Sequence, residues 1–476
     1  MYQIFKFVLL LHSLFLVWQL NVVQGDTNKP PNFVIILTDD QGYGDLGCYG
    51  SQNVKTPRID QMAAEGAKLT SFYMAAPYCT PSRAALMTGS YPIRIGMAGG
   101  VCLSADKKGM HPNEITIAEV LKSVGYKTGL FGKWHLGDQP EFLPTQQGFD
   151  EFFGLPYSHD IHPHNPKSNN RFPPLPMLEG DKVIELEPDA DLLTKRFTDR
   201  AVEFIKQNKS HPFFLYLPHP IPHRPLHMTS PYMEGLSEET RLALTQEKVT
   251  GTVNYSVRDK LYFRAIEEID WSVGQILDTL KNQGLDENTI VIFSSDNGQA
   301  PPPVGIGTAA PLKGSKGTTW EGGLRVPTVI RWPGKIIANT ENKELLTAMD
   351  LLPTFAKLAG SSLPADRVID GKDITSVLTE GTASPHEAFF YHRMNALQAV
   401  RSGKWKLHTG RKGKHGPGKA LFNLDTDIGE STNVLADHPE VVKRLTSYMA
   451  AFKKEVSNNK RPAGFVAKPK NLTLSK

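Results

Sequence analysis

Two continuous apolar segments that end in acidic residues stand out in the pattern of hydrophobic and polar positions. The first reads NFVIILTDD at residues 32–40, and the second reads TIVIFSSDNG at residues 289–298. An apolar run without alternation is typical of a strand that is buried on both faces, as in a parallel sheet. The pattern therefore predicts two buried strands with acidic groups at their carboxyl ends.

Segments with apolar residues at helical spacing surround these two runs. They predict amphipathic helices at residues 57–69, 116–126, 192–208 and 261–284. Strands that alternate with helices indicate an α/β fold. Two long irregular stretches, residues 162–181 and 300–317, are expected to form the rim of a functional site.

From about His386 the pattern changes to short strands. The segments EAFFYHR, LQAVRSGKWKLH and KALFNL are followed by the helical pattern HPEVVKRLTSYMAAFKKEV. This succession predicts a small α+β domain with an antiparallel sheet and a terminal helix. We expect a larger domain at residues 26–385 and this smaller domain at residues 386–476.

The N-terminus has the pattern of a signal peptide. Lys6 precedes an apolar run at residues 7–20, and small residues follow in NVVQG. Because a bilayer span needs roughly 20 residues, removal of residues 1–25 is favoured over an uncleaved anchor. We expect an exported protein, periplasmic or secreted, without stable membrane insertion.

Composition narrows the class of protein. Charged residues make up 21% and apolar residues 40% of the 476-residue chain, as in ordinary globular proteins. The net charge of +4 forms no long basic run, which argues against a nucleic-acid partner. Three cysteines are an odd number, so at least one lacks an intramolecular partner. Cys48 and Cys102 could form a disulfide or remain free thiols, and we favour free thiols.

The acidic strand ends are candidate metal ligands. In α/β sheets, ligands gather beyond the carboxyl ends of the strands, where Asp39, Asp40, Asp296 and Asn297 would meet. Oxygen donors suit a hard cation such as Ca²⁺ or Mg²⁺ better than zinc. Such a cation would polarise an anionic ligand. The alternative is that these residues only form turns.

Two lysines lie in segments that suit an anionic ligand. In KWHLG, Lys133 and His135 are two apart, so an extended chain would place both on one face. The alternative is a surface lysine beside a buried histidine. GSKGTTWEGG fails the test for a nucleotide-binding P-loop because Gly317, not Ser or Thr, follows Lys316. Lys316 remains a candidate anion binder on a glycine-rich loop.

Histidines recur at His219, His223 and His227 in LPHPIPHRPLH. Their spacing of four resembles one helical face, but the intervening prolines exclude that helix. A zinc site built on such a face is therefore disfavoured. We expect an extended loop that points one or two of these histidines into a cleft.

The segment YCTPSRAALMTG contains Cys79 at or before the start of a helix, with Pro81 in the first turn. A helix N-terminus favours anions, and Arg83 adds a positive charge one turn later. This setting would lower the pKa of a thiol. Cys79 is then either a thiolate nucleophile or a structural cysteine.

Together these segments resemble the type I, formylglycine-dependent sulfatase family of the alkaline-phosphatase-like superfamily. CTPSRAALMTG contains the complete signature C-x-P-S-R-x-x-x-x-T-G, and further family blocks follow the family order: ILTDDQGYGDLGCYG, GKWHLG, GLPYSHD, SSDNG and SKGTTWEGG. The resemblance implies an alkaline-phosphatase-like sandwich, with a large, mostly parallel central sheet flanked by helices. It also implies hydrolysis of sulfate monoesters, either aryl sulfates or sulfated sugars, to alcohol and inorganic sulfate.

By this resemblance, a formylglycine-generating enzyme oxidises Cys79 to formylglycine (3-oxoalanine) during maturation. One hydroxyl of the hydrated aldehyde would attack sulfur, and the other would lose its proton to expel sulfate. Ca²⁺, with Mg²⁺ as the alternative, would be held by the family's ligands, which here are Asp39, Asp40, Cys79, Asp296 and Asn297.

The remaining family roles also transfer by resemblance. Arg83 would stabilise the formylglycine hydroxyls, and Lys133 and Lys316 would neutralise sulfate oxygens. His135 would assist deprotonation of the hydrate. His223 would bind sulfate and, with Lys316, protonate the leaving alcohol.

Two roles rest on a weaker match. Ser158 would lie near the sulfate. His219 is the alternative to His223 as the sulfate-binding histidine of the proline-rich loop.

Two alternatives to a sulfatase remain at this point. One is a phosphate or phosphonate monoester hydrolase of the same superfamily, and the other is a non-catalytic binder of sulfated glycans. The few cysteines also depart from the disulfide-rich lysosomal relatives, which favours the periplasm or the medium over a lysosome.

Overall fold

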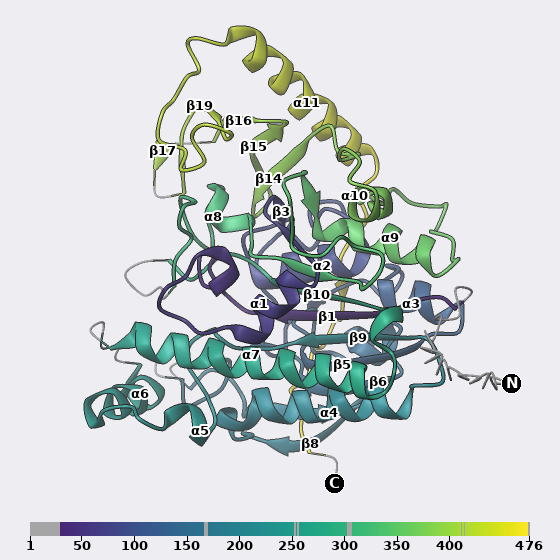
Figure 1. Ribbon diagram of the computed structural model, residues 1–476, viewed down its shortest axis with the longest axis vertical. Coiled ribbons are helices and arrows are strands. Elements are labelled where there is room, and N and C mark those ends of the chain that lie inside the picture. The colour runs from purple at the N-terminus through teal and green to yellow at the C-terminus, as the bar shows by residue number, and fades with distance from the viewer. Residues whose placement is uncertain are drawn as a thin grey trace, which may run out of the picture.

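The computed structural model describes residues 29–474, except 166–169, 252, 253, 255, 256, 302–306, 411 and 414. The predicted signal peptide, residues 1–25, lies outside the described residues. Within the described part of the chain, a ten-stranded sheet forms the centre of the molecule, in the order β12-β2-β11-β10-β1-β9-β5-β6-β7-β8 (Figure 1).

The middle of the sheet is parallel and its flanks are mixed. The parallel strands are β10 (Thr289–Ser295), β1 (Asn32–Thr38), β9 (Phe213–Pro218), β5 (Lys127–Lys133) and β6 (Glu151–Leu155). The flanking strands are β11 (Val329–Arg331), β2 (Ala67–Leu69), β12 (Thr340–Asn342), β7 (Pro176–Glu179) and β8 (Lys182–Leu186). Antiparallel pairs join β10 to β11, β11 to β2, β6 to β7 and β7 to β8.

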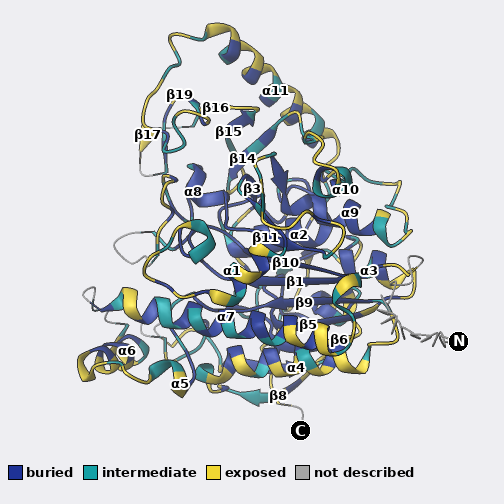
Figure 2. Cartoon of the chain, viewed as in Figure 1, coloured by how far each residue is buried: buried dark blue, intermediate teal, exposed yellow. Residues whose placement is uncertain are grey.

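Alternate residues of the buried strands belong to two hydrophobic layers, one on each face of the sheet. Phe33, Ile35 and Leu37 of β1 pack with α2 (Cys79–Thr88), α3 (Ile117–Lys122) and α9 (Leu351–Leu358). Val34 and Ile36 pack with α1 (Pro57–Ala64), α4 (Leu193–Gln207) and α7 (Arg258–Asn282). Figure 2 shows the central strands β1, β9 and β10 buried and the outer faces of α4 and α11 exposed. The predicted α/β sandwich, with a mostly parallel centre and flanking helices, is confirmed.

Two expectations on local structure were wrong. The helix expected at residues 57–69 ends at Ala64, and its last residues form β2. Gly66 allows this close approach, since a Cβ there would lie 2.1 Å from the carbonyl oxygen of Ile330. The stretch 162–181 is not wholly irregular, because its end forms β7 of the central sheet.

The smaller domain has the expected antiparallel sheet and helix. Its sheet contains β14 (Phe389–Arg393), β15 (Ala396–Ser402), β16 (Trp405–His408) and β19 (Ala420–Asn423), and α11 (Pro439–Asn458) packs against it. After α11 the chain returns to the larger domain, where β20 (Gly464–Phe465) pairs with β4 (Lys108–Gly109).

Short elements complete the described chain. They are β3 (Phe72–Tyr73), α5 (Ser230–Met233), α6 (Glu238–Thr250), α8 (Glu321–Leu324), β13 (Leu346–Thr347), α10 (Thr375–Thr379), β17 (Lys412–Gly413) and β18 (Gly416–Pro417). None of the helices in the described ranges combines the length and the apolar content needed to cross a bilayer.

Candidate active site

Parallel pairing of β1 with β10 brings the acidic strand ends together. Thr38 and Ser295 are register partners, so the residues that follow them emerge side by side. The backbone N–H of Asp40 donates to Asp296 Oδ1 at 3.2 Å, and Asn297 Nδ2 donates to Asp40 Oδ1 at 2.7 Å. Asp40 has a left-handed φ of 65°, a backbone strain that often accompanies functional sites.

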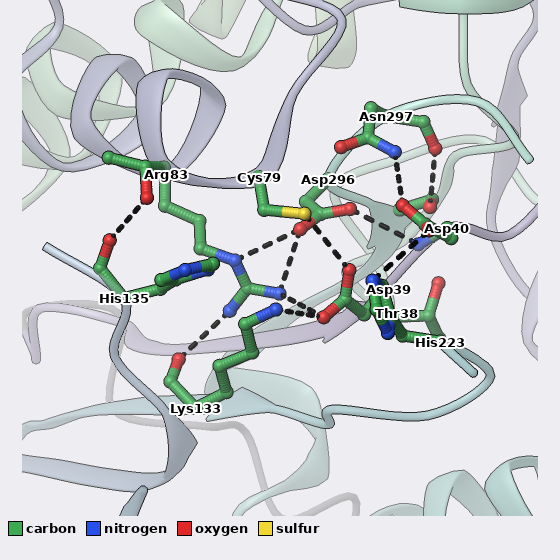
Figure 3. Close-up of polar contacts among 12 residues, drawn as sticks. Thr38, Asp39, Asp40, Cys79, Arg83, Lys133, His135, His223, Asp296 and Asn297 are labelled. Atoms are coloured by element: carbon green, nitrogen blue, oxygen red, sulfur yellow. Dashed lines mark hydrogen bonds and ion pairs between the residues drawn. The ribbon is translucent and has the colours of Figure 1, made fainter. Parts of the chain in front are cut away.

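Cys79 lies against these acids at the first position of α2 (Figure 3). Its thiol donates to Asp39 Oδ1 at 3.3 Å and is buried. Ligand atoms of Asp39, Asp40, Cys79 and Asp296 all lie within 4.8 Å of one another. The structure thus brings together two strand ends and one helix start that are far apart in sequence.

The lowered thiol pKa that the helix start predicted for Cys79 is not found in this setting. Burial raises the pKa of the thiol well above its usual value, and the charges of Asp296 and Asp39 raise it further. Lys316 and Lys133 act in the opposite direction without reversing the shift. The prediction of a lowered pKa took account of the helix start and Arg83 alone, and left out the carboxylates around the sulfur.

Three cations face the three carboxylates. Arg83 Nε donates to Asp296 Oδ2 at 3.0 Å, and Lys133 forms an ion pair with Asp39. Lys316 Nζ lies 2.7 Å from Asp40 Oδ1 and 3.2 Å from the sulfur of Cys79.

These pairings shift the pKa values of two of the acids in opposite directions. Burial raises the pKa of Asp39, but the attraction of Lys133, His223, Arg83 and Lys316 outweighs it and holds that pKa well below its usual value. Burial raises the pKa of Asp296 to about 6, and repulsion by Asp39 contributes, while Arg83 opposes it.

The donor set fits a hard divalent cation. Asn297 is fully buried, and its Oδ1 has no hydrogen-bond partner among the described residues. Buried polar atoms are nearly always bonded, so an exception calls for a ligand or another explanation. An amide oxygen together with three clustered carboxylates matches the ligands that Ca²⁺ and Mg²⁺ prefer. Asp39, Asp40, Asp296 and Asn297 could hold such an ion, with Cys79 at its edge.

Lys133 and His135 are both in the site, but not on one strand face. β5 ends at Lys133, and His135 follows with a left-handed φ of 66°. The His135 ring is buried beside Arg83 (Figure 3), and neither ring nitrogen has a partner among the described residues. Burial, reinforced by the charges of Lys133 and Arg83, lowers its pKa well below the usual value. The neutral ring can accept a proton.

Of the three histidines in the proline-rich loop, only His223 reaches the acids. Its Nε2 lies 3.6 Å from Asp40 Oδ2. The ring of His219 is buried, with Nε2 3.0 Å from Ser272 Oγ on α7. His219, the alternative to His223, therefore faces α7 and not the acids. His227 Nδ1 lies 2.8 Å from Asp191.

Ser158 lies in the turn after β6 and is buried. Its neighbour His159 packs edge-on against His223, with ring centroids 5.8 Å apart. The structure therefore places Ser158 one residue before a histidine that packs against His223.

A cavity of about 260 Å³ opens above Asp40, His223 and Lys316. Its described walls include the polar and charged residues Asp160, His162, Asn165, Arg224, Glu247 and Lys248. His162, Asn165, Ala300 and Pro301 of the expected rim line it, while residues 166–169 and 302–306 lie outside the described residues. Arg224 and Glu247 form an ion pair of 2.6 Å that sequence reasoning missed, because it joins a loop to α6.

Each of the three cysteines is a free thiol. Cys102 is buried within the layer of α2 and α3, whereas Cys48 is half-buried beside the layer of α1. Free thiols were favoured from the sequence, but the two residues belong to opposite sides of the sheet.

Comparison with known proteins decides the family. A family model described as Sulfatase matches residues 31–361, and one described as N-sulphoglucosamine sulphohydrolase, C-terminal, matches residues 315–455. The chain belongs to the sulfatase family. This sulfatase is accordingly a sulfuric ester hydrolase, as its sequence resemblance implied.

Curated relatives cover most of the sulfatase chain. Arylsulfatase A of Homo sapiens is 36% identical over 464 residues, covering 88% of this chain and 86% of the relative. N-acetylgalactosamine-6-sulfatase of Rattus norvegicus is 38% identical over 409 residues, covering 82% and 73%.

Solved structures support the same assignment. Ps i-CgsB in complex with k-i-k-neocarrahexaose is 31% identical with a TM-score of 0.75, over 92% of this chain and 95% of that chain. A phosphonate monoester hydrolase of Agrobacterium radiobacter is 20% identical with a TM-score of 0.61, over 90% and 96%. That likeness shows the shared fold alone, so it does not support the phosphonate alternative.

Proposed function

We propose that this sulfatase hydrolyses carbohydrate sulfate esters through a formylglycine formed from Cys79, with Ca²⁺, or Mg²⁺ as the alternative, held at the strand ends. The observation that carries the proposal is the surroundings of Cys79. A buried sulfur between Asp39 and Lys316 cannot ionise readily, so an unmodified thiol is a poor nucleophile here. The same position suits a group that needs both a cation and a base beside it.

When formed, the hydrated aldehyde supplies an attacking hydroxyl and a second hydroxyl whose deprotonation releases sulfate, while the cation supplies positive charge to the sulfate. Asp39, Asp40, Asp296 and Asn297 would hold the cation.

The chain's own cations surround the same point. Arg83 lies within the acid cluster and would hold hydroxyl oxygens at the position of the Cys79 sulfur. Lys133 and Lys316 approach from two sides of that cluster, and both would neutralise sulfate oxygens as charge develops.

Two histidines would move protons. His135 is neutral and has no hydrogen-bond partner in the described part of the chain, so it can accept a proton at a buried ring nitrogen. His223 lines the cavity and could hold a proton for the leaving alcohol, with Lys316 beside it. Ser158 would contribute to the sulfate pocket next to His223.

The substrate proposal rests on the charged and polar groups that line the cavity. Its described walls carry carboxylates, imidazole, guanidinium and ammonium groups, which suit a ligand rich in hydroxyls. One relative is named N-acetylgalactosamine-6-sulfatase, and one solved neighbour is in complex with k-i-k-neocarrahexaose. Small aryl sulfates should also be cleaved, because they need only the sulfate end of the cavity.

Export and maturation are further parts of the proposal. The N-terminal pattern favours a periplasmic or secreted enzyme, with the lysosome as the alternative in a eukaryotic host. A formylglycine-generating enzyme would be the maturation partner, and no nucleic-acid partner is expected.

The test compares 4-nitrophenyl sulfate with 4-nitrophenyl phosphate, using enzyme co-expressed with a formylglycine-generating enzyme. We expect the sulfate ester to be hydrolysed faster, with activity lost on chelation and restored by Ca²⁺. A screen of sulfated mono- and oligosaccharides, read by released sulfate, then identifies the sugar. Faster phosphate release would favour the phosphoesterase alternative, and glycan binding without any turnover would favour a binder.

A further inference from the structure

The loop that carries Lys316 is tied down on its inner side. The backbone N–H of Lys316 donates to Gln299 O at 2.9 Å, and that of Gly317 donates to Pro77 O at 2.9 Å. Thr318 Oγ1 closes the turn by donating to Ser315 O at 2.7 Å. Gly317 has a φ of +81°, which a side chain would strain. These bonds aim the Lys316 ammonium at Asp40 and Cys79.

The outer side of the same loop is held by the smaller domain. Arg393, the last residue of β14, donates from Nε to Gly317 O at 2.9 Å. Thr319 Oγ1 donates to Gln398 Oε1 of β15 at 3.1 Å. Both carbonyl and N–H of Gly317 are therefore bonded, one to the smaller domain and one to the segment before Cys79.

A buried charge network anchors the end of this loop. Glu321, five residues after Lys316, is fully buried and accepts hydrogen bonds from Lys406 Nζ at 2.8 Å and Tyr391 Oη at 2.7 Å. Lys406 also pairs with Glu430 at 2.8 Å. Glu430 in turn accepts the backbone N–H of Glu321 at 2.7 Å.

This network, Glu321–Lys406–Glu430, has no member among the described residues lining the substrate cavity. Desolvating three charges is costly, and a buried pair adds little net stability over an apolar core. The network does fix the positions of its members, because each charged group bonds to a defined partner. One end of the network belongs to the loop of Lys316 and the other end to the smaller domain.

We propose that the smaller domain is a positioning element for Lys316, acting through Arg393 and through the network Glu321–Lys406–Glu430. The proposal rests on the proposed function, in which Lys316 neutralises charge on the sulfate. Arg393 holds the loop at the residue next to Lys316, while the network fixes where the loop enters α8. Neither touches the sulfate, so both act on catalysis only through the reach of Lys316.

The test is a double-mutant cycle between Arg393→Ala and Lys316→Ala, measured as kcat and KM on 4-nitrophenyl sulfate. Arg393 is partly exposed, so its truncation should leave the fold intact. We expect Arg393→Ala to lower kcat about tenfold or more, since small misplacements of catalytic groups are costly. In the Lys316→Ala background the same change should cost less than about twofold, because the two losses share one cause.

Two controls and a second readout accompany the cycle. Arg444→Ala, on the exposed face of α11, should leave kcat unchanged, and Arg393→Lys should recover part of the lost kcat. Hydrogen exchange of the peptide around Gly317 should be faster in Arg393→Ala than in Arg444→Ala. Formylglycine content is measured in each variant, so that kcat refers to modified enzyme.

An equal loss from Arg393→Ala in both backgrounds would overturn the proposal, as would an unchanged kcat in the wild-type background. Failure of the proposed function gives a different result. In that case Lys316→Ala alone would keep the wild-type kcat, and there would be no catalytic role of Lys316 for the smaller domain to support.

Discussion

Two clusters of buried charge in this molecule differ in how completely their polar atoms are satisfied. At the strand ends, Asn297 Oδ1 and both ring nitrogens of His135 have no partner among the described residues. At the domain junction, the described side chains of Glu321, Lys406 and Glu430 leave no buried nitrogen or oxygen unpaired. Both clusters are shielded from water to a similar degree.

The difference distinguishes a site that can bind a ligand from a network that only fixes the positions of its own members. Unpaired buried groups cost free energy unless something binds them, so they persist where function requires them. A fully paired network has no capacity left for a substrate. Burial and charge alone would not have distinguished the two clusters.

The largest expected effect comes from removing the sulfur at the first cluster. Cys79→Ala should lower kcat about 10⁴-fold or more, because it removes the precursor of the nucleophile. Stability should change little, since the sulfur makes only weak hydrogen bonds, to Asp39 and from Lys316. Cys48→Ala, at a half-buried cysteine outside the site, is the matched control and should keep full activity. Comparable activity in both variants would contradict the assignment of Cys79.

Breaking the second cluster should act mainly on stability. Lys406→Met keeps the volume of the side chain but leaves Glu321 and Glu430 buried without their shared cation, at a cost of about 3–5 kcal/mol. The free energy of unfolding in urea measures this loss. Lys404→Met, at an exposed neighbour, should cost far less. Equal stabilities of the two variants would show that the network does not hold the loop of Lys316 to the smaller domain.

His135→Ala should separate activity from stability within the first cluster. We expect kcat to fall about 10²–10³-fold, as for loss of a general base. The free energy of unfolding should drop only by the packing lost, because the ring makes no hydrogen bond to any residue that the structure describes. Kinetics and urea unfolding of one preparation give both numbers. A large loss of stability with kcat retained would reverse the interpretation of this residue.

The smallest expected effect concerns pH. Because burial and Asp39 raise the pKa of Asp296 to about 6, this carboxylate is protonated below that pH and ionised above it. Protons then compete with Ca²⁺, and the Kd for Ca²⁺ should rise about tenfold per pH unit below pH 6. Calorimetric titration of chelator-treated enzyme between pH 5 and 7 measures the slope. A Kd independent of pH over this range would exclude Asp296 as a titrating ligand.

The sequence predicted the first cluster better than the second for a physical reason. β1 and β10 are continuous apolar runs, and the rule that ligands gather at strand ends placed Asp39 and Asp296 together. Their register, with Thr38 opposite Ser295, depends on tertiary pairing that no local pattern specifies. The flanking antiparallel strands are short and were missed for the same reason.

The second cluster could not be read from local pattern. Lys406 lies between Trp405 and Leu407 in β16, where alternation predicts a lysine that faces solvent. The larger domain covers that face, and Lys406 is fully buried. Lys316 could be predicted in part. Its glycine-rich loop indicated an anion binder, but no local pattern indicated the hydrogen bond from Arg393 that holds this loop.

The most direct test of the central claim is mass spectrometry of the peptide that spans Cys79, taken from catalytically active enzyme. The account predicts an aldehyde at position 79, which reacts with a hydrazide and resists alkylation by iodoacetamide. An alkylatable thiol at position 79 in fully active enzyme would contradict it.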